Sequence, residues 1–250
     1  MRLDLMSWPE VDIYLKGRND IVVPIGSTEQ HGPNGLVGTD ALCAEVIGRA
    51  VGEKAAAVVA PTISIGMAQH HLGFPGSMSL RPSTLLAVVR DVIASLAQQG
   101  FLRISFVNGH GGNIATVTAA FAEFYSETSF SAGRTATRVE CRLRNWWEAP
   151  SVQTITSELF GDAEGMHATA SEVSVTQFAF PNAIKRVDLD PEIAPTGVFT
   201  DAVSYCLAFP DGRIGSNPTL ASPEAGARLV EAAASDLAVD HLKWIGRHEA

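Results

Sequence analysis

Three short polar clusters carry the side chains in this sequence that could do chemistry. The first, GSTEQHGPNGLVGTD at 26–40, contains Glu29, His31 and Asp40. Because Glu29 and His31 are two residues apart, an extended segment turns both to the same side. One imidazole and two carboxylates are ligands suited to zinc, manganese or iron(II). Taken alone, the cluster has two equally good interpretations. It is such a metal site, or it is a solvated loop in which Asp40 supports a helix N-terminus.

The second cluster is NGHGGN at 108–113, where His110 stands between glycines. The glycines give an imidazole little packing, so a structural histidine here needs a buried partner from elsewhere. A histidine that faces the first cluster from a neighbouring strand end is more typical of a metal ligand. Asn108 and Asn113 are expected to fix the loop by side-chain to backbone hydrogen bonds, or to orient the ligand.

The third cluster, GMHATASE at 165–172, holds His167 and Glu172. Glu172 is a candidate ligand, and His167 is a candidate proton carrier because the ordinary pKa of histidine lies near neutrality. The alternative is that Glu172 only favours the start of a helix, and for this cluster alone that is the simpler interpretation.

Five of the seven histidines fall in these clusters or in QHH at 69–71. Gln69, His70 and His71 are predicted to contact substrate, with support of the site or a subunit contact as an equal alternative. Trp146 and Trp147 are predicted to wall a planar substrate, although core or interface packing fits them at least as well. The remaining histidines, His241 and His248, are expected at solvated positions.

Apolar runs predict the elements that position these clusters. We expect buried strands at 21–26, 57–65, 102–107 and 135–143, and helices at 40–54 (after Thr39 as N-cap), 82–100, 114–125 and 222–242. This alternation favours a mostly parallel sheet covered on both faces, and ligands bind beyond the carboxyl ends of such strands. Residues 181–221 are interpreted as long surface connections, so that 1–250 forms a single domain.

Composition narrows the class of protein. The 250 residues are 46% hydrophobic and 18% charged with a net charge of −9, which excludes disorder and a domain-wide basic surface for nucleic acid. Neither a run of about 18 apolar residues nor a signal peptide is visible, so no membrane partner is expected. Three distant cysteines argue against a disulfide framework and favour the cytoplasm.

The motifs GSTEQHGP at 26–33, TDA at 39–41, FPGSMSL at 74–80 and FVNGHGGN at 106–113 resemble the creatininase (creatinine amidohydrolase) family. The resemblance runs in register from about residue 20 to 180. It implies a three-layer α/β/α sandwich that holds one or two divalent ions (Zn, Mn or Fe) and hydrolyses a C–N bond in a small amide. Family activities include creatinine ring opening, formamidopyrimidine deformylation and trimming of a precursor peptide. A homo-oligomer, often a hexamer, is also implied.

The resemblance also implies residue roles. Glu29, His31, Asp40 and His110 match metal ligands, with Asp40 bridging if two ions bind. In the segment that the family writes as H-A-G-E-x-E, here HATASE, Glu172 matches the glutamate and His167 the histidine that moves protons.

This chain also departs from the family pattern. Creatininase has His-Tyr-Glu where this chain has His110-Gly111-Gly112, so one ligand of the second ion and a substrate-contacting tyrosine are missing. Asn34-Gly35 and Ala170-Ser171 differ as well. Two alternatives follow: Glu172 replaces the missing ligand, or the second ion binds weakly. Creatinine itself is not the expected substrate.

The sequence therefore predicts a metal-dependent amidohydrolase for a small cyclic amide, a formamide or a related compound. A metal-activated water is expected to attack the carbonyl, and His167 to protonate the leaving nitrogen. The alternatives are a peptidase that trims a modified peptide, and a catalytically silent protein that binds a metal or ligand. A Gly-rich nucleotide site at GHGG is disfavoured, because the lysine of a phosphate loop is absent.

Overall fold

A computed structural model describes residues 1–131 and 138–246, and at its centre lies a sheet of four parallel strands. The strand order is β2-β1-β3-β4. The strands are β1 (Asp20–Ile25), β2 (Val58–Val59), β3 (Arg103–Asn108) and β4 (Glu140–Asn145). In register, Ile21 of β1 lies beside Val58 and Ile104, and Ile104 lies beside Cys141. Every residue of β1 is buried, as expected for a central strand covered on both faces.

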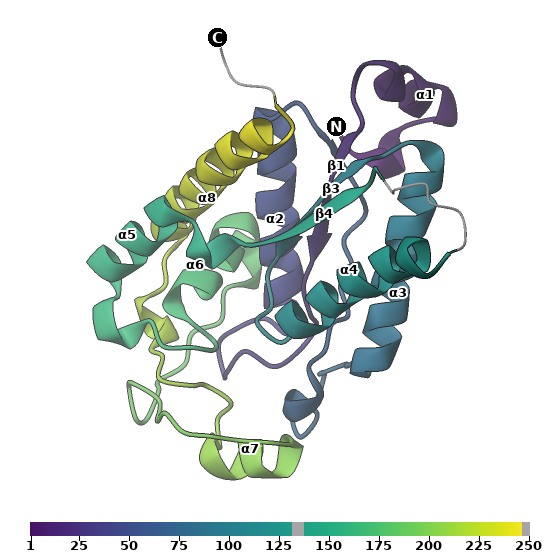
Figure 1. Cartoon of the computed structure of the whole chain (residues 1–250). Coiled ribbons are helices and arrows are strands. Elements are labelled where there is room, and N and C mark those ends of the chain that lie inside the picture. Colours follow the sequence, from purple (N-terminus) through teal and green to yellow (C-terminus); the bar gives the residue numbers. More distant parts are fainter. Residues whose placement is uncertain (132–137, 247–250) are drawn as a thin grey trace.

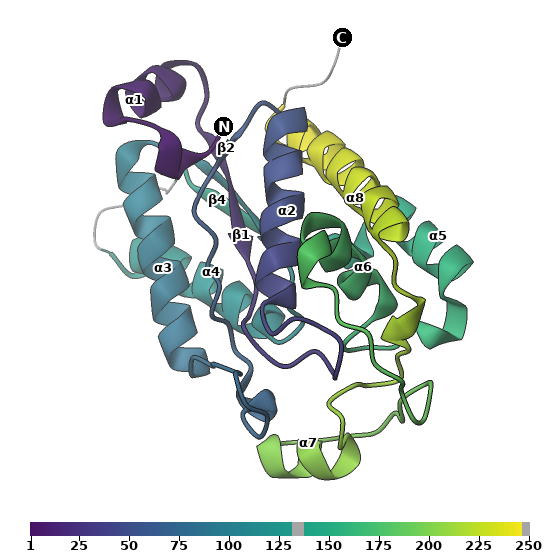
Figure 2. The ribbon, with the colours of Figure 1, turned by 180° about the vertical axis from the view of Figure 1, so that it is seen from behind.

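Helices cover both faces of the sheet and give the three-layer α/β/α sandwich (Figures 1 and 2). One face carries α2 (Thr39–Lys54), α5 (Pro150–Leu159), α6 (Ala170–Ala179) and α8 (Pro223–Trp244). The other carries α3 (Pro82–Gln99) and α4 (Asn113–Phe130), with α1 (Trp8–Gly17) at the amino ends of the strands. Short 3₁₀ turns lie at Leu3–Leu5, Gln69–His71, Trp146–Glu148, Gly161–Ala163, Pro181–Ala183 and Pro218–Leu220.

Two apolar cores hold the layers together, one on each side of the sheet. Val22 of β1 packs with Ile47 and Leu229 in the core beneath α2 and α8, whereas its neighbour Val23 packs with Leu85 and Phe106 in the core beneath α3 and α4. Successive side chains of a strand point to opposite faces, so the apolar run of β1 serves both cores. The α/β class predicted from the alternating elements is confirmed.

Helix ends follow the expected local chemistry. Pro82 lies at the start of α3, and Gly100 ends it with a φ of 110°, a left-handed conformation that favours glycine. Ser222 caps α8 by accepting a hydrogen bond from the Ala225 amide. The cap of α2 is Gly38, not the predicted Thr39, whose hydroxyl instead donates to the Leu36 carbonyl (2.7 Å).

Two predicted strands are shorter than expected. The run 57–65 forms only the two-residue β2 and an isolated bridge between Ile63 and Ile25. Pro61 interrupts the run, because it has no amide hydrogen to donate to a ladder. The strand predicted at 135–143 begins at Glu140, and residues 135–137 lie outside the described residues.

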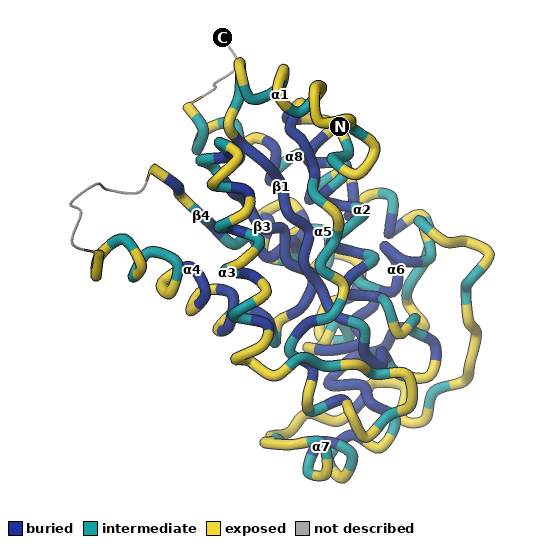
Figure 3. The backbone as a smooth tube through the Cα atoms, turned by 90° about the vertical axis from the view of Figure 1, so that its right-hand side faces the viewer, coloured by how far each residue is buried: buried dark blue, intermediate teal, exposed yellow. Residues whose placement is uncertain are grey.

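The segment 181–221 runs mostly over the surface, as the sequence suggested, with two exceptions. It contains α7 (Ala202–Ala208), which lies beyond the carboxyl ends of the strands, and an entirely buried stretch at 212–218 (Figure 3). The guanidinium of Arg213 is buried and donates to the carbonyls of Pro191, Glu192 and Ser216. A buried cation thus fixes a segment whose weak apolar periodicity suggested a surface loop.

His241 is also misplaced by the sequence interpretation. It is buried on α8, where its Nε2 lies 2.8 Å from Asp20 Oδ2 at the amino end of β1. His248 lies outside the described residues. Among the helices of the described part, none is long and apolar enough to cross a membrane.

Candidate metal centre

Six of the predicted site residues converge at the carboxyl edge of the sheet. They are Glu29 and His31 after β1, Asp40 in the first turn of α2, His110 after β3, His167 before α6, and Glu172 in the first turn of α6. The first five are buried, and Glu172 is half-buried. Segments separated by more than a hundred residues in sequence therefore meet at one point.

Close packing of backbone brings the first and second clusters together. A Cβ at Gly26 would lie 2.5 Å from the Ala41 backbone, and one at Gly109 would lie 2.1 Å from the Asp40 carbonyl. Both glycines therefore allow the strand ends to touch the start of α2. Asn113 then ties the loops by donating to the Gly26 carbonyl (2.9 Å) and accepting from the Met67 amide (3.0 Å). The side-chain to backbone role expected for Asn113 is observed.

The ligand atoms fall into sets that could each hold a cation. Glu29, Asp40 and His110 offer atoms within 4.8 Å of one another, and so do His31, Asp40 and Glu172. Asp40 belongs to both sets. Its Oδ1 lies 2.9 Å from His31 Nε2 and its Oδ2 lies 2.9 Å from His110 Nδ1. Glu29, His31 and His167 form a third such set, so two of the three sets share the Asp40 carboxylate.

Two carboxylate oxygens in these sets lack hydrogen-bond partners in the described part of the chain. Glu29 Oε1 and Asp40 Oδ2 are buried and accept no aligned donor. His110 Nδ1 lies 3.3 Å from the first oxygen and 2.9 Å from the second, and His71 Nε2 lies 3.0 Å from the first, but none of these contacts has the geometry of a hydrogen bond. Burying such oxygens is costly unless something pairs with them. A bound cation would satisfy both oxygens and the imidazole nitrogen at once.

The outer nitrogens of two histidines are held by backbone carbonyls. His31 Nδ1 donates to the Glu29 carbonyl (3.0 Å), and His110 Nε2 donates to the Met67 carbonyl (3.0 Å). A carbonyl can only accept, so each outer nitrogen carries hydrogen and each inner nitrogen faces the carboxylates. Metal-ligating histidines are commonly oriented in this way.

The buried carboxylates of the centre favour positive charge on the groups beside them. Burial opposes the charged form of His31, but Asp40 outweighs it and raises the pKa of His31 to about 10. Burial likewise opposes charge on His110, and Glu29 and Asp40 raise its pKa to about 9. Burial works to raise the pKa of Asp40, yet the two imidazoles hold it well below its ordinary range. Without a metal, His31 Nε2 and His110 Nδ1 are therefore protonated, and these protons occupy the positions where cations would bind.

Glu172 combines the two roles that the sequence left open. Its Oε2 accepts hydrogen bonds from the Thr169 amide and hydroxyl (both 2.9 Å), and Thr169 caps α6 in return. Its carboxyl also belongs to the set with His31 and Asp40. Burial raises the pKa of Glu172 to about 7. The capping role therefore orients a carboxylate that can also serve as a ligand.

A glutamate at position 112, as in creatininase, does not fit this backbone. A Cβ at Gly112 would lie 2.4 Å from His110 Nε2 and 2.5 Å from the Met67 carbonyl. By contrast, a Cβ at Gly111 would meet no atom within 4 Å, and Gly111 lines the cavity described below. The departures noted in the sequence leave open space at 111 and make Glu172 the carboxylate of the second set.

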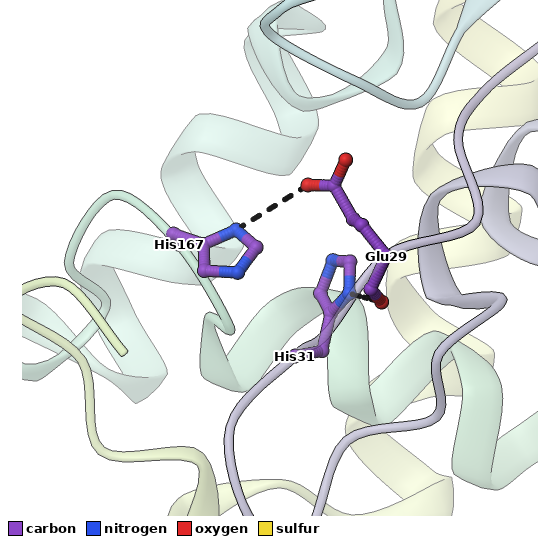
Figure 4. Close-up of side chains that lie close together, drawn as sticks. All are labelled: Glu29, His31 and His167. Atoms are coloured by element: carbon purple, nitrogen blue, oxygen red, sulfur yellow. Dashed lines mark hydrogen bonds and ion pairs between the residues drawn. The ribbon is translucent and has the colours of Figure 1, made fainter. Parts of the chain in front are cut away.

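His167 faces the same centre from the opposite side (Figure 4). Its Nδ1 lies 3.9 Å from Glu29 Oε1, and its ring lies 4.6 Å from that of His31. Burial, followed by the charges of His31 and His71, holds its pKa well below the ordinary value. His167 is therefore a neutral imidazole beside the candidate cation positions, where it can accept and return a proton.

A cavity of about 670 Å³ opens onto the centre. Its walls include His70, His71 and Trp147 from the predicted substrate contacts. Gln69 is exposed and does not line the cavity, and Trp146 is fully buried in the core beneath α8. The predicted substrate contact is therefore wrong for Trp146, because its ring points into the core, and finds no support in the placement of Gln69.

Several residues at the site carried no clear signal in the sequence. Phe199, Tyr205 and Ile214 come from the segment interpreted as surface connections. Gln30, which is buried between two predicted ligands, was overlooked. Glu164 also lines the cavity. Gln30 had a usable signal, since an extended segment that aims Glu29 and His31 to one side must aim Gln30 to the other. The others depend on tertiary packing alone.

The fold and the centre together define an α/β protein with a histidine and carboxylate cluster at the carboxyl edge of a parallel sheet. Comparison with known proteins identifies the family to which the chain belongs. The family profile described as creatinine amidohydrolase matches residues 4–239, and the chain belongs to the creatininase family.

Relatives within this family are hydrolases with different substrates. The mycofactocin precursor peptide peptidase of Mycolicibacterium smegmatis is 34% identical over 84% of this chain and 78% of its own. The 3-dehydro-scyllo-inosose hydrolase of Thermotoga maritima is 27% identical over 91% of this chain and 78% of its own. A solved structure of a mutant creatininase, described as Zn-Zn type, superposes with a TM-score of 0.81 at 22% identity, covering 98% of both chains. The creatininase-like fold is thus established.

Proposed function

We propose that this protein is a hydrolase that binds two divalent metal ions and cleaves an amide C–N bond. The observation that carries the proposal is the pair of ligand sets that share Asp40, with Glu29 Oε1 and Asp40 Oδ2 buried and unpaired in the described chain. When bound, such ions supply Lewis acidity, which activates water and polarises a carbonyl oxygen. A protein that binds a metal without catalysis would not need a neutral buried histidine beside the two ligand sets.

The donor set fits zinc, manganese or iron. Glu29, Asp40 and His110 would hold one ion, and His31, Asp40 and Glu172 the other. Imidazole and carboxylate ligands suit all three metals, and the zinc form of a creatininase with this fold supports the choice of zinc for a first test.

The chain itself supplies the proton transfer. Amide hydrolysis requires that water lose a proton as it attacks the carbonyl carbon and that the departing nitrogen gain one. His167 is neutral and faces the centre with Nδ1, so it can take the proton from water and return it to the leaving nitrogen. Its burial keeps bulk water from competing for that proton.

The cavity supports an amide larger than a small ring as a second candidate substrate. Its volume of about 670 Å³ lies in the range of sites for drug-sized ligands, and Gly111 adds open space at its wall. The 34% identity to a precursor peptide peptidase points the same way. The first candidate remains a small cyclic amide or formamide, and the second is the terminal amide bond of a short peptide.

A direct test combines metal loading with a substrate panel. The metal-free protein, reconstituted with Zn²⁺, Mn²⁺ or Fe²⁺, should hydrolyse at least one of a panel of lactams, formamides, cyclic ureides and short peptides, followed by release of amine or carboxylate. A peptide hit without a lactam or formamide hit would select the second candidate. A correctly folded protein that binds no divalent ion at micromolar concentration would overturn the proposal.

A further inference from the structure

Gln30 is the most highly connected side chain beside the centre. It is buried, and its amide nitrogen Nε2 donates to the Gly212 carbonyl (2.8 Å) while its Oε1 accepts from the Gly32 amide (2.8 Å). A backbone carbonyl cannot donate and a backbone amide cannot accept, so the two ends of the Gln30 amide cannot exchange places. The orientation of this amide is therefore fixed by the backbone.

The fixed amide determines the hydrogen on His71. Gln30 Nε2 lies 2.9 Å from His71 Nδ1, and the only acceptor in that pair is the ring nitrogen. His71 must therefore carry its hydrogen on Nε2, which lies 3.0 Å from Glu29 Oε1. A protonated ring nitrogen has no lone pair for a metal. His71 consequently faces the Glu29 carboxylate as an N–H group and not as a further ligand.

The backbone of the same residue determines the hydrogen on His167. His167 Nε2 lies 2.9 Å from the Gln30 carbonyl, so this nitrogen must carry hydrogen. It also lies 2.9 Å from Gln30 Nε2, but the two hydrogens of that amide are committed to Gly212 and His71. The Nδ1 of His167 is then left without hydrogen on the side of Glu29.

We propose that Gln30 is a positioning residue that assigns opposite roles to two histidines at the centre. It makes His71 an N–H group that cannot compete as a ligand, and it holds His167 with a bare Nδ1 directed toward the centre. Tyr205 supports the arrangement, because its hydroxyl donates to the same Gly212 carbonyl (2.8 Å). A side chain on residue 212 would displace the amide, since a Cβ there would lie 1.9 Å from Gln30 Oε1.

The catalytic meaning of this assignment rests on the proposed function, whereas the ring tautomers do not. In a hydrolase, the bare Nδ1 of His167 is the atom that takes and returns the proton. Replacement of Gln30 by Glu leaves its backbone carbonyl on His167 but bares His71 Nε2 beside Glu29, where it would compete as a ligand. This change should reduce kcat by about 10–100-fold, as for other groups that orient a metal-site histidine.

The test is long-range ¹H–¹⁵N NMR of the histidine rings in the zinc-loaded protein. His71→Asn and His167→Asn variants assign the resonances. The wild-type rings should both show Nε2–H with unprotonated Nδ1.

Gln30→Glu replaces the donor by an acceptor and should move hydrogen to His71 Nδ1. Gln30→Leu removes the amide and should leave the His71 tautomers mixed, while the retained Gln30 carbonyl keeps hydrogen on His167 Nε2. Gln98→Glu, the same chemical change on exposed α3, is the matched control and should leave both rings as in wild type.

A wild-type spectrum with hydrogen on Nδ1 of either ring would overturn the inference without any variant. Unchanged rings in both folded Gln30 variants would overturn it as well. If the tautomers are as expected but no amide is hydrolysed, the proposed function fails and the role of Gln30 in setting the tautomers stands.

Discussion

Strand β1 carries a buried carboxylate and histidine cluster at each of its ends, and the two clusters are built differently. At the amino end, both oxygens of Asp20 are paired: Arg18 Nε donates to Oδ1 (2.8 Å), and Arg18 Nη2 (2.6 Å) and His241 Nε2 (2.8 Å) lie at Oδ2. At the carboxyl end, Glu29 Oε1 and Asp40 Oδ2 have no hydrogen-bond partner among the described residues.

The difference lies in where the positive charge comes from. Arg18 supplies a permanent cation at the amino end, and although burial works the other way, His241 and Arg18 hold the pKa of Asp20 well below its ordinary range. None of the residues that line the cavity at the carboxyl end is a lysine or arginine. The chain therefore pairs both oxygens of the first carboxylate by itself, with only His241 Nδ1 unpaired there among the described residues, and leaves an oxygen of each carboxylate unpaired at the second cluster. Under the proposed function, the first cluster serves stability and the second serves metal binding.

Asp40→Ala should have the largest effect, because Asp40 belongs to both ligand sets. We expect both ions to be lost and activity to fall by more than about 100-fold, beyond the usual cost of removing a group that only orients a ligand. Metal content after gel filtration, measured by mass spectrometry, checks this result. Two ions retained in the folded variant would contradict the shared position of Asp40.

Asp20→Asn should affect stability and leave binding intact. It removes the buried partner of an ion pair whose other partner, Arg18, is half-buried, so the loss of unfolding free energy should lie below the ~3–5 kcal/mol of a fully buried pair. Urea denaturation of the metal-free protein measures the loss, and the metal content of the folded variant should equal that of wild type. If Asp20→Asn lost metal as Asp40→Ala does, the two ends of β1 would not have separate roles.

The sequence predicted the carboxyl-end cluster better than the amino-end one for a physical reason. Glu29, His31 and Asp40 lie in one glycine-rich loop after an apolar strand, and parallel sheets collect such loops at one edge. His241 gave no such signal, because it lies on an amphipathic helix where only the docking of α8 against β1 decides its burial. Within the segment 181–221, only the buried stretch 212–218 was misjudged, because Arg213 satisfies buried carbonyls and periodicity does not reveal such bonds.

Glu172→Gln should sharpen the comparison by separating helix capping from metal binding. The amide oxygen of glutamine still accepts from Thr169, so we expect the free energy of unfolding to change by less than about 1 kcal/mol. The ion held with His31 and Asp40 should bind at least ~10-fold more weakly, while the other stays. Calorimetric titration with Zn²⁺ resolves the two ions. Unchanged binding of both ions would show that Glu172 only caps α6, and equal weakening of both would contradict its assignment to one ion.

Metal binding should release protons, and this is the smallest effect that separates the two ends of β1. The pKa values of about 10 for His31 and about 9 for His110 mean that both inner nitrogens are protonated at pH 7 before metal binds. A metal needs their lone pairs, and the Glu172 carboxyl, with a pKa of about 7, gives up part of a proton as well, so filling both positions at pH 7 should release about two to three protons. The overall affinity should then rise about 100-fold per pH unit between pH 7 and pH 9. Calorimetry at pH 7 in two buffers of different ionisation enthalpy counts the protons. Asp20→Asn should release the same number as wild type, because its cluster takes no ion. A titration without proton release would mean that the inner nitrogens are already bare, and the charge demand inferred for the carboxyl end would be wrong.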